Sequence, residues 1–304
     1  MTTSSRSGLL FGLAAYGLWG LFPLYFLLFA RSGAVEVVAH RALWSLVFCA
    51  LLLTLTRQWP AVARTLTDRR TTLSLGLAGV LIVVNWSTYV FAVLTGRTLE
   101  TALGYFINPL AVAGLGILVL GERLRRLQLV AILFGLASVV VMVAGYGEVP
   151  WTALLLAGSF GLYSLVKKVA GRSVGALPGL AIETGVVAPV AVAYLTYLGL
   201  AGASTATLSD GYAGLLVTTG IVTAVPLLLF AAAARRVSMI TIAILQYLAP
   251  IGQFLLGWLV FDEPMPASRW AGFVLIWIGV LVFVVDAVVA SNRHGRATRR
   301  AAAR

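Results

Sequence analysis

Charged side chains are scarce in this chain. Only 11% of its 304 residues are Asp, Glu, Lys or Arg, whereas 61% are hydrophobic, and the mean hydropathy is +1.00. A soluble globular protein needs more polar surface than this composition can supply. The low charge therefore excludes a soluble fold and predicts a protein embedded in a lipid bilayer.

Cysteine and histidine are also nearly absent. Cys49 is the only cysteine, and His40 and His294 are the only histidines. A single cysteine excludes a disulfide within the chain and argues against a thiolate metal site. We therefore expect no metal and no cofactor.

Acidic residues are outnumbered by basic ones, with 10 Asp and Glu against 22 Lys and Arg and a formal net charge of +12. Such a balance can indicate nucleic-acid binding. Here, however, the basic residues occur in short breaks between apolar runs and near the C-terminus. That distribution is typical of membrane topology, so we expect no nucleic-acid partner.

Long apolar runs fill the rest of the chain. About 20 apolar residues are needed to cross about 30 Å of hydrocarbon. Ten runs fit this requirement, at residues 8–29, 36–56, 72–94, 100–120, 127–145, 151–168, 178–199, 211–234, 240–261 and 270–290. A backbone in lipid must satisfy its hydrogen bonds within the segment. The sequence therefore predicts an all-α membrane protein with ten transmembrane helices.

The positions of the basic residues predict the orientation. If the N-terminus is cytoplasmic, the outside breaks hold only Arg31, Arg97 and Arg269 of the 22 Lys and Arg, and Arg41 lies within a span. Cytoplasmic loops are enriched in Lys and Arg. Both termini are therefore predicted to be cytoplasmic.

The chain also repeats itself. A shift of about 141 residues superposes Pro109 on Pro250 and Gly79 on Gly220. Because each copy has five spans, the second copy enters the membrane from the opposite side, which is the inverted-repeat architecture of secondary transporters. We predict a first repeat at 1–147, a second, inverted repeat at 148–291 and a basic cytoplasmic tail at 292–304. Structural duplication without transport is the alternative.

Two matched spans carry a polar patch beside a proline. The patches are Tyr105 and Asn108 beside Pro109, and Gln246 and Tyr247 beside Pro250. Proline within a helix frees the carbonyl four residues earlier, and polar groups at mid-membrane must face protein or a watery cavity. These four polar residues are predicted to line a substrate cavity between the halves; the alternative is a pair of structural kinks.

Asn85 and Trp86 lie together in the third span. Asn85 offers a donor and an acceptor, and Trp86 offers a flat wall on which a ring-bearing substrate could stack. We predict that both contact the substrate. Packing against neighbouring helices is the alternative.

Glu36, His40 and Arg41 open the second span, near its predicted outer mouth. Ionisable groups within a span are functional candidates, and an unperturbed histidine titrates near neutrality. The three are predicted to act in gating or proton coupling. The alternative is an interfacial anchor in which Arg41 reaches toward the headgroups and Glu36 neutralises it.

Glu183 lies near the cytoplasmic end of the seventh span, and the repeat places it close to the position of His40 and Arg41 at the opposite membrane face. One ionisable group near each mouth suits a pair of alternating gates. The alternative is an ion pair between Glu183 and Lys167, Lys168 or Arg172.

Several motifs resemble one known family. They are HRALWS (40–45), QW (58–59), NW (85–86), LGYFINPL (103–110), LGERLRR (120–126), IVTAVPLLLFAAAARR (221–236) and QYLAP (246–250). They resemble the RarD branch of the EamA family, within the drug/metabolite transporter superfamily, over essentially the whole chain. The resemblance implies a permease of the bacterial plasma (inner) membrane with two five-helix repeats. The resemblance identifies neither a substrate nor a settled set of binding residues.

The function expected from these features is a secondary transporter that moves a small metabolite or an amphipathic, drug-like compound by alternating access. No GxxxxGK[ST] loop is present, so energy is expected from an ion or substrate gradient, with proton coupling through His40 or Glu183 as a further expectation. The expected partners are a small-molecule substrate and the lipid bilayer, and no oligomeric state is predicted. An integral-membrane enzyme, such as a lipid-modifying transferase, and a channel are the alternatives.

Overall fold

A computed structural model describes residues 3–121, 125–170 and 174–302. Helices and their connections make up this part of the chain, which contains no strand. In order, the helices are α1 (Thr3–Leu27), α2 (Ala34–Leu55), α3 (Trp59–Thr67), α4 (Arg69–Leu94), α5 (Thr98–Leu120), α6 (Arg126–Tyr146), α7 (Trp151–Ala170), α8 (Ala176–Leu200), the short 3-10 helix η1 (Thr205–Thr207), α9 (Asp210–Ala234), α10 (Met239–Leu245), α11 (Leu248–Leu255), the π-helical turn η2 (Leu256–Val260) and α12 (Ala267–Ala302). The prediction of an all-α protein is confirmed.

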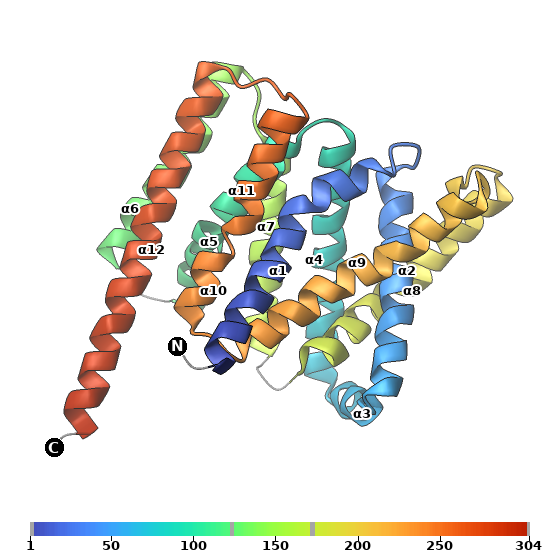
Figure 1. Ribbon diagram of the computed structural model, residues 1–304, viewed down its shortest axis with the longest axis horizontal. Helices are drawn as coiled ribbons and strands as arrows, with labels where there is room; N and C mark the ends of the chain where they lie inside the picture. The colour runs from blue at the N-terminus through green and yellow to red at the C-terminus, as the bar shows by residue number, and fades with distance from the viewer. Residues whose placement is uncertain (1–2, 122–124, 171–173, 303–304) are drawn as a thin grey trace.

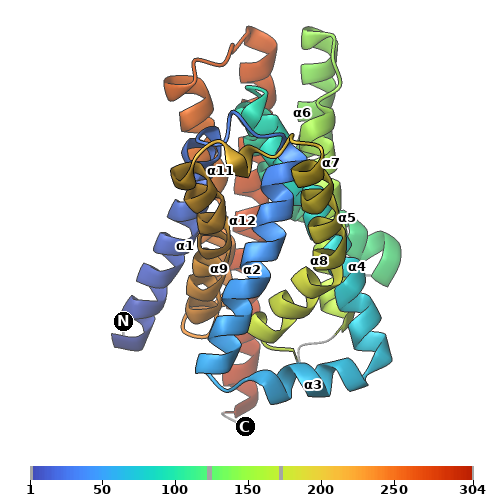
Figure 2. The ribbon, with the colours of Figure 1, turned by 90° about the vertical axis from the view of Figure 1, so that its right-hand side faces the viewer.

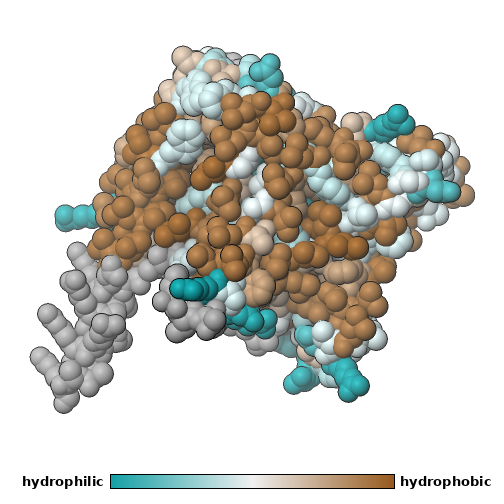
Figure 3. Space-filling view, in the orientation of Figure 1, coloured by the Kyte–Doolittle hydropathy of each residue, from teal (hydrophilic) through white to brown (hydrophobic). Residues whose placement is uncertain are grey.

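Many of these helices can cross a bilayer. Within the described residues, seven are long and apolar enough by composition, namely α1, α2, α4, α6, α8, α9 and α12, and Trp151–Lys167 and Leu248–Val260 are shorter apolar helices. Large apolar side chains face outward, for example Leu118 at 84% exposure and Leu200 at 86%. Hydrophobic residues also cover most of the face seen in Figure 3. An outward apolar surface of this extent suits lipid rather than water.

The helices run up and down side by side (Figure 1). One end of the bundle holds α3, the start of α1 and the end of α12, and is called here the α3 end. The opposite end holds η1 and the connection from α1 to α2, and is called the η1 end (Figures 1 and 2). The first and last helices therefore begin and end at the same end of the bundle.

Helix α3 occupies a stretch that the sequence analysis treats as a break. Pro60 lies in its first turn, where its missing N–H costs nothing, and Val62 is its buried side chain. Trp59 and Leu66 are exposed. This helix lies across the α3 end instead of spanning the bundle (Figure 2).

The two matched prolines have different local consequences. Pro109 lies inside α5, which is continuous from Thr98 to Leu120. Pro250 lies in the first turn of α11, and Gln246 and Tyr247 separate that helix from α10. The predicted span at 240–261 is therefore two short helices and a π-helical turn. Helix α12 continues through the predicted tail at 292–304 as far as Ala302.

Two apolar cores hold the bundle together. One is centred on residues of α1, α2, α4 and α8, including Phe26, Val90 and Ile182. The other joins α5, α6, α11 and α12, including Phe106 and Phe273. Helix α6 packs along α12, and α5 contacts α11.

Two glycines allow close contacts between helices, one between α4 and α8 and one between α9 and α2. A Cβ on Gly79 of α4 would lie 2.5 Å from the carbonyl oxygen of Glu183 on α8, and one on Gly220 of α9 would lie 2.3 Å from that of Trp44 on α2. Small residues let helix backbones approach closely in membranes. Helix α4 therefore meets α8 in the same manner as α9 meets α2.

Candidate functional site

Arg41 lies at the junction of four helices. Its side chain is on α2 and only 5% of the residue is exposed. The guanidinium carbon lies 4.1 Å from the ring centroid of Trp86 on α4 and 5.4 Å from that of Phe26 on α1. Its Nε donates a 2.8 Å hydrogen bond to Thr223 Oγ1 on α9. Arg41 is predicted to lie near a membrane surface, whereas the structure encloses it in protein.

Aromatic residues surround this cation. The group is called here the Arg41 cluster and consists of Phe22, Phe26, Arg41, Trp86, Tyr89, Tyr105 and Thr223. The hydroxyl groups of Tyr89 and Tyr105 lie within electrostatic reach of the guanidinium. Tyr105 donates to Asn85 Oδ1 at 3.3 Å, and the buried Tyr89 hydroxyl has no hydrogen-bond partner in the described residues.

Asn85 is already engaged with protein. Its Nδ2 donates to the Leu156 carbonyl and to Ser159 Oγ, both at 3.1 Å. Since Leu156 and Ser159 lie on α7, Asn85 links α4 to α7 and also holds the Tyr105 hydroxyl. The amide thus positions the neighbouring Trp86 and Tyr105 at the cluster.

Arg41 has no acidic partner among the residues that the structure describes. The alternative in which Glu36 neutralises Arg41 is wrong. Glu36 Oε1 instead accepts from the Thr205 backbone N–H at 2.7 Å and from Ser204 Oγ at 3.2 Å. The first N–H groups of a helical turn lack internal partners, so this carboxylate satisfies the start of η1.

His40, one residue earlier, lies partly buried on α2. Its Nδ1 accepts a 3.3 Å hydrogen bond from Trp44 Nε1. Its Nε2 is buried without a hydrogen-bond partner in the described part of the chain. The role predicted for His40 in proton coupling stays a prediction.

Glu183 lies on α8, 1% exposed. It forms an ion pair with Lys167 of α7 and accepts a hydrogen bond from Tyr163 at 3.2 Å. The alternative that pairs Glu183 with Lys167 is confirmed. The other two partners considered, the Lys168 side chain and Arg172, lie outside the described residues.

The remaining predicted substrate-binding residues lie on α5 and at the junction of α10 and α11. Tyr247 stacks on Phe106 with ring centroids 6.3 Å apart, in the core formed by α5, α6, α11 and α12. Asn108 is buried with its Oδ1 unpaired within the described residues, and Gln246 is partly buried between α10 and α11. The structure brings Asn85, Trp86 and Tyr105 to Arg41, and it places Tyr247 in the other core.

Two buried polar contacts involve Gln253 and Glu263, which are not among the predicted site residues. Gln253 is 2% exposed; it accepts from Thr101 Oγ1 at 3.1 Å and donates to the Trp19 carbonyl at 3.3 Å. It thereby joins α11 to α5 and α1. A lone amide in the apolar run 248–261 was the available signal.

Glu263 makes the second of these contacts, from the connection between η2 and α12. Its carboxylate accepts from the backbone N–H groups of Thr98 and Leu99, at the start of α5. Burial raises the pKa of this carboxyl, although the two N–H groups act in the opposite direction. The residue ties the connection before α12 to the η1 end of α5.

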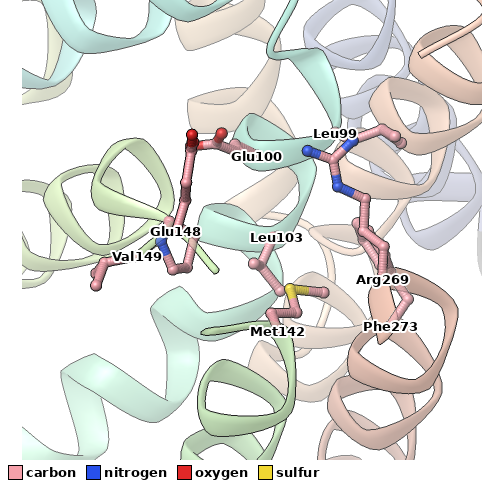
Figure 4. A pocket seen from close by; sticks show the side chains of 9 residues that line it. Leu99, Glu100, Leu103, Met142, Glu148, Val149, Arg269 and Phe273 are labelled. Atoms are coloured by element: carbon pink, nitrogen blue, oxygen red, sulfur yellow. The ribbon is translucent and has the colours of Figure 1, made fainter. Parts of the chain in front are cut away.

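Two surface pockets lie at opposite ends of the bundle. The one in Figure 4 is lined by Leu99, Glu100, Leu103, Met142, Glu148, Val149, Pro150, Arg269 and Phe273. The other is lined by Ala61, Arg64, Thr65, Asp68, Thr71, Val174, Gly175 and Pro178. Neither contains a predicted site residue. The described residues contain no group of three or more His, Cys, Asp or Glu that could bind a metal.

Comparison with known proteins places these features in a family. The model of the EamA-like transporter family matches residues 6–144 and, a second time, residues 150–285. The protein RarD of Streptomyces exfoliatus is 46% identical over 98% of this chain and 94% of its own length. The uncharacterized transporter YojE of Bacillus subtilis (strain 168) is 42% identical over 93% and 95%.

Further similarities agree with this assignment. The protein RarD of Escherichia coli (strain K12) is 38% identical over 96% of this chain and 98% of its own length. A solved structure described only as "Crystal structure of protein" has 18% identity and a TM-score of 0.55, and it covers 91% of this chain and 97% of that one; it shares the fold. The protein is a multi-pass membrane protein, and it belongs to the EamA-like transporter family, in the branch that includes the RarD proteins.

Proposed function

We propose that this protein is a secondary transporter that moves a small metabolite or an amphipathic, drug-like compound across the bacterial inner membrane by alternating access. The observation that carries the proposal is the symmetry of the helix contacts. When the two halves of the chain are exchanged, the most extensive contacts between helices map onto one another or onto themselves.

The mapping pairs α1 with α7, α2 with α8, α4 with α9, α5 with α10 and α11, and α6 with α12. Contact α1–α9 then maps onto α7–α4, α1–α11 onto α7–α5, and α2–α9 onto α8–α4, while α2–α8, α5–α11 and α6–α12 map onto themselves. The double family match supports the same division. We therefore assign ten spans in two inverted repeats, at 1–147 and 148–291, followed by the basic tail at 292–304.

Individual positions support this mapping. Gly33 and Gly175 both precede their helices in extended backbone conformation. Gly79 and Gly220 make the matching close contacts described above. In an inverted repeat, alternating access is largely the rocking of one half against the other around a fixed site.

Hydrogen bonds at the η1 end join the two proposed halves. Ser32 Oγ lies 2.7 Å from both Thr205 Oγ1 and the Tyr212 hydroxyl. Glu36 bonds to Ser204 and Thr205 in the same region. Outward opening in the proposed cycle separates these contacts.

A reversible crosslink tests the proposal. In a Cys49→Ala background, Ser32→Cys with Thr205→Cys should form a disulfide that holds the η1 end shut. We expect at least a tenfold loss of counterflow in proteoliposomes, recovered on reduction, with the single variants unaffected. The flux is measured with a compound selected by thermal-shift screening of amino acids, nucleosides, sugars and antibiotics. Full counterflow by the oxidised protein, or flux that never saturates as in a channel, rejects alternating access.

We propose that the α3 end is cytoplasmic. Exposed Arg57, Arg64, Arg69 and Arg70 lie there, as does the start of α1, and cytoplasmic loops favour such residues. In intact cells of the Cys49→Ala variant, an impermeant thiol reagent should label Arg97→Cys but not Arg57→Cys. The reverse labelling would invert the topology.

Proton coupling through His40 or Glu183 is part of this proposal. It is supported by His40 Nε2, which has no hydrogen-bond partner among the described residues, and by the burial of Glu183 beside Lys167. An imposed pH gradient should change the flux, and His40→Ala or Glu183→Gln should remove that response. A rate that does not change with the gradient rejects coupling.

A further inference from the structure

We infer that the Arg41 cluster binds the oxyanion of a small organic anion, a carboxylate or a phosphate. This inference rests on the proposed transport function and names its class of substrate. It starts from the charge of the cluster, because a buried guanidinium is costly unless it is paired.

The protein satisfies Arg41 only in part. A guanidinium has five N–H donors, and within the described residues only Nε makes a hydrogen bond, to Thr223. The faces of Trp86 and Phe26 stabilise the cation without using those donors. The planar donor fork of arginine matches a carboxylate or phosphate bidentately. An oxyanion is therefore the missing partner.

The surroundings of Arg41 fit the rest of such a ligand. The Tyr89 residue is 3% exposed, and its hydroxyl is a further buried donor without a partner in the described residues. Phe22 and Phe26 supply apolar walls beside the guanidinium. Because α1, α4 and α9 enclose Arg41, the site suits a soluble molecule that enters between the halves better than a lipid at the surface.

Replacing Arg41 distinguishes anion binding from a purely structural role. The Thr223 hydroxyl also donates to the Thr219 carbonyl at 2.7 Å, so it keeps a partner when Arg41 is replaced. Asn85 has its own partners on α7. Arg41→Met should thus leave no buried polar group newly unpaired and should unfold at a temperature no lower than the native protein does. A marked loss of thermal stability in this variant would favour a structural role.

Binding to the purified full chain tests the inference with matched probes. Benzoate is compared with benzamide, and phenyl phosphate with benzyl alcohol, by thermal unfolding and calorimetry. We expect at least one anion to bind and stabilise the protein where its neutral counterpart does not. Its affinity should fall at least tenfold in Arg41→Met and less in Arg41→Lys. Arg31→Gln, which removes an exposed positive charge from the connection between α1 and α2, is the control and should bind as the native protein does.

Three results overturn the inference: no response to either anion, equal responses to anion and neutral counterpart, or full affinity in Arg41→Met. Tyr89→Phe removes one hydroxyl and keeps the ring, so it provides a second variant if Arg41→Met does not fold; unchanged affinity in Tyr89→Phe together with Arg41→Lys also rejects the site. Counterflow separates this failure from that of the proposed function. Saturable flux of neutral compounds that is independent of Arg41 retains the transporter and rejects the anion site, whereas Arg41-dependent binding without flux rejects the transporter.

Discussion

Arg41 and Glu183 occupy the same position in matched helices but differ in how their charges are satisfied. Each lies seven residues beyond the alanine that begins its helix, Ala34 in α2 and Ala176 in α8. Glu183 has a cation, Lys167, and a hydroxyl donor. Arg41 has aromatic rings and one threonine, and no carboxylate within the described residues.

The difference shows which of the two sites is complete without a ligand. A buried charge with an internal partner is part of the framework, since breaking the pair leaves an uncompensated charge. A buried charge without an internal partner can be stabilised by a bound ligand of opposite charge. The most extensive helix contacts are alike when the halves are exchanged, whereas these two buried charges are satisfied differently.

The largest expected effect tests the completeness of the Glu183 site. Lys167→Met leaves the Glu183 carboxyl buried without its cation and should cost about 3 kcal/mol of unfolding free energy. Lys167→Met combined with Glu183→Gln should recover most of that loss. Denaturant unfolding in detergent measures both. If Lys167→Met and Arg41→Met destabilise equally, the contrast between the two sites is lost.

The next effect tests whether the two halves pack alike. Gly79→Ala and Gly220→Ala place a Cβ against the helix backbone of the partner half, and overpacking of this kind should cost about 1–3 kcal/mol in each case. The matched controls are Gly76→Ala on α4, where the nearest atoms lie 3.7 Å away, and Gly214→Ala on α9, where nothing lies within 4 Å. Thermal unfolding should show the two close-contact variants shifted and the two controls unshifted. A loss at only one of the close contacts would contradict the symmetry.

A smaller effect is expected for the support of the Arg41 cluster. Asn85→Ala removes two hydrogen bonds to α7 and should cost about 1 kcal/mol, the scale of polar contacts between membrane helices. Because Tyr105 also loses its partner on Asn85, the affinity for the anionic probe should fall by a few fold. Ser159→Ala, which removes only one of these bonds, should cost less. Equal losses in the two variants would mean that the Leu156 contact contributes nothing.

The smallest effect compares the two residues that cap α4 and α9. Asp68 accepts from backbone N–H groups at the start of α4, and Ser209 does so at the start of α9. The Thr71 hydroxyl and the nearby N–H groups lower the pKa of Asp68. A lowered folded pKa stabilises the protein above the unfolded pKa, and this contribution is lost as the pH falls through the folded value. Asp68→Ser should remove this slope in acid, and Ser209→Asp should add a second one. Unchanged pH profiles of the unfolding temperature in both variants would contradict the role of the cap.

Part of the candidate site could be read from residue types alone. Arg41, Trp86, Asn85 and Tyr105 were identified because a charge, an indole and polar groups are conspicuous in apolar runs. That Arg41 contacts Trp86, and that Glu36 instead bonds to Thr205, depends on how distant helices pack. The same packing places Tyr247 and Trp86 in different cores. Their positions along the predicted spans do not reveal this separation.

The sequence by itself determined that this protein lies in lipid and that it is helical. Apolar runs long enough to cross a bilayer can satisfy their backbone hydrogen bonds only as helices. The sequence also predicts the duplication, through glycines and prolines at a constant spacing. Only the tertiary structure decided which buried charges are paired, since a salt bridge or a cation–π contact requires side chains from different helices to come within a few ångströms. For this reason Glu183 and Arg41 look equivalent along the chain and differ in the folded molecule.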